Sequence, residues 1–111
     1  MADIGNAEQR LDQFLNDECD SVPTWIYPRF QGGFLCAEVR SKSGSVIHLR
    51  ISREFVEDTV PTEFEYRLKD SGLCDELRGA SPAPFVVIKW RGPGIVALTR
   101  RTSDPAHITR T

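Results

Sequence analysis

Apolar residues recur over the first twenty positions of the chain with the spacing of an amphipathic helix. Ala7, Leu11, Phe14 and Leu15 stand at i, i+4, i+7 and i+8, which places them on one face of an α-helix. Asn6 precedes this stripe and is a residue type that often caps helix N-termini. The pattern predicts a helix over residues 7–18 with Asn6 as its N-cap.

Three segments after this helix are rich in the residue types of β-strands and are separated by glycine-containing turns. The segments are residues 24–27, 34–40 and 45–51. In the last of them Ile47, Leu49 and Ile51 alternate with His48 and Arg50, so the isoleucines and the leucine should face the core and the other two should face outward. The spacing predicts an antiparallel meander.

A second hairpin is predicted near the C-terminus. Residues 85–91 and 95–101 flank a Gly-Pro-Gly turn. Val86, Ile88 and Trp90 should face the core, and Lys89 and Arg91 should then point to solvent.

The segment between the meander and this hairpin gives mixed signals. Ser52 is a candidate N-cap for a helical turn over residues 53–58. Residues 62–70 fit a capping box, Thr62 to Glu65, but the apolar Phe64, Tyr66 and Leu68 alternate with charged residues. We therefore expect a strand there, followed by a short helix over residues 71–78.

These elements predict an α+β fold, in which an N-terminal helix packs on a mostly antiparallel sheet of five or six strands built from hairpins. A chain of 111 residues with 40% apolar and 27% charged residues fits one globular domain. We expect that domain to cover residues 1–102. Residues 103–111 are predicted to form a flexible polar tail, because they offer little apolar area to offset the entropy of ordering.

No apolar run approaches the length of a membrane span, and the first twenty residues are acidic where a secretory signal would be basic and then apolar. We therefore expect a cytoplasmic protein of bacterial type without a membrane partner. Cys19, Cys36 and Cys74 are odd in number and widely spaced, which argues against a disulfide framework or a zinc site. They are predicted to be reduced, with Cys36 in the core and Cys74 unreactive beside two acids.

Charge is segregated along the chain although the net charge is only −2. Residues 25–53 hold five basic residues against Glu38, and residues 85–111 hold five against Asp104. These basic blocks coincide with predicted strands, so one sheet face should be cationic. The expected partner-binding residues are Arg40, His48, Arg50, Lys89, Arg91 and Arg101.

Catalytic chemistry finds little support in the sequence. Neither His48 nor His107 has a carboxylate or cysteine at the spacing of a known ligand pattern, and the glycine turns lie between strands instead of opening a helix. We predict no catalytic residue, no metal site and no cofactor.

Two binding functions remain. The first is a small non-catalytic protein-protein interaction module, such as an adaptor, an immunity protein or a chaperone, whose partner has an acidic surface. The order of helix, meander, helix and hairpin is similar to that of type III secretion chaperones, which are also small and acidic, but no residue motif matches and the long C-terminal helix is missing. The alternative is a nucleic-acid-binding module with a basic sheet face, against which stands the pI of about 5.6.

Overall fold

Helix α1 (Ile4–Asp17) forms where the apolar stripe predicted a helix. Leu11, Phe14 and Leu15 of that stripe are almost completely buried. The helix begins before Asn6, which is therefore inside it and not its N-cap. This computed structural model describes residues 4–19, 21–27, 29–40, 44–59, 61–78, 83–92 and 95–106.

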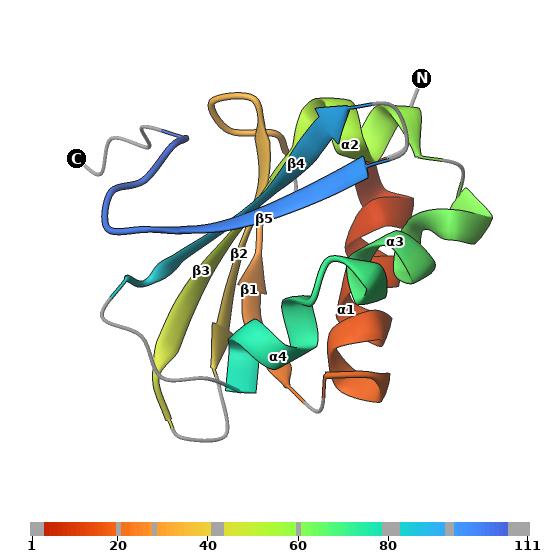
Figure 1. Ribbon diagram of the computed structural model, residues 1–111. Helices are drawn as coiled ribbons and strands as arrows, with labels where there is room; N and C mark the ends of the chain where they lie inside the picture. Colours follow the sequence, from red (N-terminus) through yellow and green to blue (C-terminus); the bar gives the residue numbers. More distant parts are fainter. Residues whose placement is uncertain are drawn as a thin grey trace.

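A five-stranded sheet forms the second layer, and the helices pack on one side of it (Figure 1). Its strands, in spatial order, are β1 (Val22–Ile26), β2 (Phe34–Arg40), β3 (Val46–Ser52), β4 (Phe85–Gly92) and β5 (Ile95–Arg101). All neighbours are antiparallel except β3 and β4, which are parallel. The predicted α+β class, the meander and the C-terminal hairpin are confirmed.

The parallel pair explains why the strand predicted over residues 62–70 is wrong. Parallel neighbours need a long crossover, and here it consists of α2 (Arg53–Asp58), the 3₁₀ turn η1 (Pro61–Glu63), α3 (Phe64–Asp70) and α4 (Leu73–Arg78). Residues 64–70 are thus helical and not a strand. Phe64 and Leu68 are buried one turn apart, whereas Tyr66 is 63% exposed, which is the periodicity of a helix and not of a strand.

The other predictions for the crossover are correct. Ser52 is the N-cap of α2, and its hydroxyl accepts a hydrogen bond from the amide of Phe55. The short helix expected over residues 71–78 is α4. Gly79, which follows α4 and is of the residue type that often ends helices, lies outside the described residues.

The core lies between the helices and the sheet face turned toward them, called the core face below. Ile47, Leu49 and Ile51 of β3 and Val86 and Ile88 of β4 are buried there, as predicted. Trp90 is half-buried at the edge of this core and packs on Phe55, with 4.9 Å between ring centroids.

A disulfide links Cys19, just after α1, to Cys74 in α4, and their Cα atoms lie 4.6 Å apart. The prediction that all three cysteines are reduced is therefore wrong; Cys36 alone is free, and it is buried. Sequence spacing could not reveal the bond because only the crossover brings α4 to the end of α1. Disulfides are typical of oxidising compartments, so this bond weighs against the cytoplasmic location expected from the sequence.

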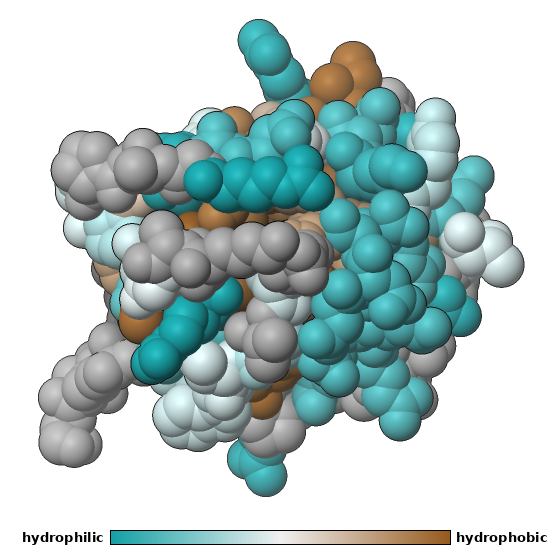
Figure 2. All heavy atoms as spheres, turned by 90° about the horizontal axis from the view of Figure 1, so that it is seen from below, coloured by the Kyte–Doolittle hydropathy of each residue, from teal (hydrophilic) through white to brown (hydrophobic). Residues whose placement is uncertain are grey.

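The outer surface of the helices is mainly hydrophilic in the view from below (Figure 2). None of the described helices is long and apolar enough to cross a membrane. This surface offers no broad apolar patch in that view.

Candidate functional site

The sheet face turned away from the helices, called the outer face below, carries the residues that alternate with the core. The strand register aligns Glu38, His48, Phe85 and Arg101 in one row across four strands. All six predicted binding residues lie on strands β2 to β5, but their surroundings differ.

Arg50 is not available to a partner, contrary to our prediction. It is 3% exposed, and its Nε and Nη2 donate to the two carboxylate oxygens of Asp104 at 2.9 and 3.1 Å. Nη1 donates to the carbonyl of Leu49, and the guanidinium lies 5.4 Å from the ring centroid of Phe85. Its charge is satisfied inside the protein, as a buried charge must be.

The electrostatics of this pair favour its ionised form. Burial alone would lower the pKa of Arg50, but the hydrogen bonds to Asp104 raise it. Burial alone would raise the pKa of Asp104, but the hydrogen bonds from Arg50 and the amide of Ala106 lower it. Both groups therefore carry charge at neutral pH.

The chain after β5 contacts the outer face, and this corrects our picture of the tail for residues 104–106. Besides the Asp104 pair, Ala106 is 4% exposed. Its backbone passes so close to Gly32 that a Cβ there would overlap it. Residues 107–111, the rest of the predicted flexible tail, lie outside the described residues.

His48 is also less exposed than predicted. Its ring is half-buried, stacks on Phe85 with 4.9 Å between centroids, and places Nδ1 3.7 Å from Oε1 of Glu38. Each of these contacts is to a neighbouring strand, so His48 contributes first to packing of the outer face.

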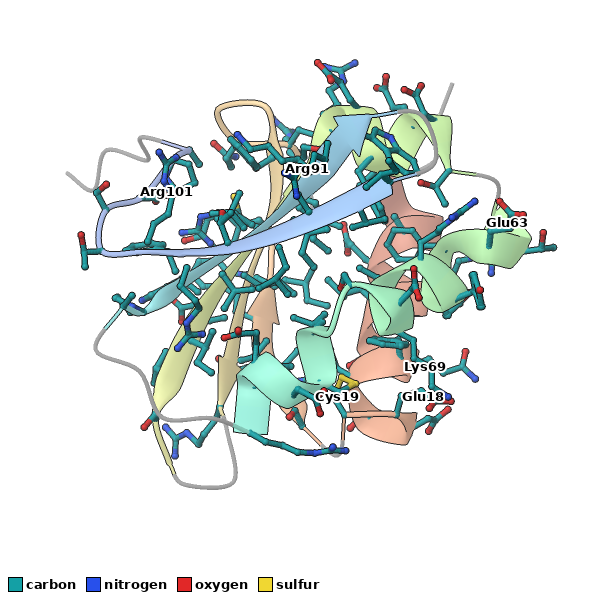
Figure 3. The ribbon with its side chains drawn as sticks, in the orientation of Figure 1. Glu18, Cys19, Glu63, Lys69, Arg91 and Arg101 are labelled. Atoms are coloured by element: carbon teal, nitrogen blue, oxygen red, sulfur yellow. A yellow bond between two sulfur atoms is a disulfide. The ribbon has the colours of Figure 1, made fainter. Side chains whose placement is uncertain are left out.

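The remaining four predicted residues, Arg40, Lys89, Arg91 and Arg101, are exposed. Within the described parts of the chain, none of the four forms an ion pair. Three belong to the β4–β5 hairpin, and we call Lys89, Arg91 and Arg101 the cationic set. Arg91 and Arg101 stand well apart along the hairpin (Figure 3). Arg40 lies on β2, three strands from β5, which is about 14 Å at ordinary strand spacing.

A pocket of about 560 Å³ lies beside the end of β4, a feature that sequence reasoning missed. Its lining residues are Glu54, Asp58, Thr59, Glu63, Arg67, Trp90, Arg91 and Gly92. Within the lining, Nη2 of Arg67 lies 3.9 Å from Oε2 of Glu63. Three carboxylates and two guanidiniums give this pocket no strong preference for a ligand of either sign.

Two observations bear on catalysis and metal binding. Burial raises the pKa of the Cys36 thiol to about 11, so the thiol is protonated at neutral pH and is a poor nucleophile. Among the described residues, no group of three or more His, Cys, Asp or Glu side chains is placed to hold a metal ion.

The residue pattern indicated the exposed cations of the hairpin, but it did not indicate that Asp104 pairs with Arg50 on the same sheet face. Asp104 is the only acid among residues 85–111, and that isolation in a basic block was the one available sign of its role. Comparison of the chain with models of protein families, with curated proteins and with solved structures finds no match in any of the three.

Proposed function

We propose that this protein is a non-catalytic binding module, whose β4–β5 hairpin engages an acidic region of a partner protein. The observation that carries the proposal is the cationic set: three exposed cations on one hairpin, without an ion pair among the described residues. Elsewhere in the described chain, basic side chains such as Arg10, Arg50, Arg53 and Arg100 are matched by carboxylates. Cations left unmatched attract an acidic partner and steer its approach.

Nucleic acid is the less favoured partner because base stacking and phosphate neutralisation would need to occur together. The exposed aromatic side chain on the described strands, Trp25, with Tyr27 4.6 Å away, lies on β1 at the opposite edge of the sheet. Four strand spacings, about 19 Å, separate it from β5. Glu38 lies between them on the outer face and would repel phosphate, and Asp104 neutralises Arg50.

Charge reversal tests this function. Lys89→Glu combined with Arg91→Glu should weaken binding of a capped peptide of Glu-Gly repeats by about tenfold, because about 1.4 kcal/mol of attraction is lost. Both side chains are exposed, so the melting temperature should stay nearly unchanged. The measurement is fluorescence anisotropy of the labelled peptide at low ionic strength.

Arg40→Glu is the matched control, since Arg40 is equally exposed but lies on β2. It should change the affinity less than twofold. Equal losses in both variants would mean that only overall charge matters, and would contradict a site on the hairpin. Tighter binding of an unrelated single-stranded oligonucleotide than of the peptide, with a steep salt dependence, would reassign the hairpin to nucleic acid.

A further inference from the structure

Strand β5 ends the sheet, and one of its edges has no partner strand among the described residues. Its ladder to β4 runs from Ile95 to Arg101, and no other described strand pairs with it. β5 is the frontmost strand in Figure 1, and no helix crosses in front of it. An edge of this kind presents unpaired backbone groups to solvent.

One hydrogen bond identifies the residues whose backbone points outward. The amide of His48 donates to the carbonyl of Pro84 at 2.8 Å, so the even-numbered residues of β4 turn their backbone groups toward β3 and the odd-numbered ones toward β5. The partners of these odd-numbered residues are Ala97, Thr99 and Arg101, and their backbone groups point back at β4. The amides and carbonyls of Val96, Leu98 and Arg100 therefore face the open edge.

The other edge of the sheet is protected. β1 has only five residues, includes Pro23, and has an irregular register between Pro23 and Trp25. Proline, irregular pairing and short length are the usual devices that prevent strand addition. β5 has seven residues and no proline, and the register shift of its hairpin falls at the turn end.

The two faces of β5 differ in chemistry. Val96 and Leu98 are half-buried on the core face and pack against the core cluster. On the outer face Ala97 and Thr99 precede Arg101, and Lys89 stands beside Ala97. An added strand would extend the core with its apolar side chains. Its outward side chains would lie next to Arg101 and, across the small Ala97, about 10 Å (two strand spacings) from Lys89. Arg101 and Lys89 are separated by four residues of strand, about 13 Å.

We propose that the β5 edge binds an extended acidic segment of a partner protein as an additional β-strand, with apolar residues on the core face and acidic residues four positions apart on the outer face. This inference rests on the proposed function and specifies how its partner is bound. Main-chain hydrogen bonds supply affinity in such complexes, and alternate side chains supply specificity. A second copy of this chain fits less well, because pairing of two β5 edges brings two cationic hairpins together.

The test uses the unaltered protein and the capped peptide Val-Glu-Val-Thr-Val-Glu-Val. In two isomers, two backbone amides are N-methylated, either on the inner valines, whose amides would point toward β5 in an antiparallel pairing, or on a Glu and the Thr, whose amides would point away from β5. Methylation of the valine amides should weaken binding at least tenfold, whereas the other isomer should stay within about threefold of the parent. Hydrogen exchange should slow at the amides of Val96, Leu98 and Arg100 when the parent peptide binds.

The possible outcomes separate the two proposals. Equal affinity of the isomers, no binding of the parent peptide, or unchanged exchange at the edge amides overturns strand addition. The binding function still stands in those cases if reversal of Lys89 and Arg91 weakens capture of the Glu-Gly peptide. A concentration-dependent dimer that protects the same amides without peptide would assign the edge to a second copy and overturn the proposal.

Discussion

Replacement of Cys74 by serine is expected to lower the free energy of unfolding by about 4 kcal/mol, because a cross-link over a separation of 55 residues strongly restricts the unfolded chain. Cys19 is 2% exposed, so in the folded variant its thiol gains almost no hydration that could offset the loss. Chemical denaturation monitored by far-ultraviolet circular dichroism measures the change. The same loss should appear when the unaltered protein is treated with a reductant.

Cys36→Ala provides the matched control. Cys36 is buried but unlinked, so this variant loses packing only and should keep its full sensitivity to reductant. Cys74→Ser should instead be insensitive to reductant. A Cys74→Ser variant as stable as the oxidised parent would show that the bond does not stabilise the fold.

Asp104→Ala is expected to cost about 2–3 kcal/mol, since it leaves the buried guanidinium of Arg50 without its bidentate partner. Loss of one partner of a fully buried pair costs about 3–5 kcal/mol. The Asp104 side chain keeps 21% of its exposure, so water moderates the penalty here. Denaturant melts at neutral pH measure the difference.

The same pair predicts a pH dependence with a definite sign. The pKa of Asp104 is lower in the folded protein than its ordinary value, so its contribution is fully present above the unfolded pKa of about 4. It is lost as the pH falls through the lower, folded pKa. The stability difference between the parent and Asp104→Asn should therefore be constant above about pH 5 and shrink below pH 4.

Two glycines test the docking of residues 104–106 without a change of charge. Gly32 and Gly33 both have positive φ, 56° and 84°, but only a Cβ at Gly32 would overlap the backbone of Ala106. Gly33→Ala should cost about 1 kcal/mol from backbone strain, and Gly32→Ala clearly more. Equal costs would indicate that the contact between Gly32 and Ala106 contributes nothing to stability.

Local patterns determined most of the secondary structure. The stripe in α1, the alternation in β3 and β4, and the Ser52 cap each depend on residues close together in the sequence, which is why short-range spacing revealed them. Residues 64–70 were predicted wrongly because a short run fits both periods. These residues are helical because they belong to the crossover that the parallel β3–β4 pair requires.

The sequence alone therefore determined the α+β class, the core face of the sheet and the exposed cations of the hairpin, because alternation places each strand residue on one face or the other. Tertiary structure alone decided which cations of the sheet form an ion pair with a carboxylate and which stay exposed to solvent. Arg50 and Lys89 look alike in sequence, but Asp104 lies 54 residues after Arg50 and reaches it only when the chain beyond β5 folds back over the sheet. The Cys19–Cys74 bond and the β5 edge, which no other described strand pairs with, depend likewise on strand order and chain path. These are long-range properties that no local spacing encodes.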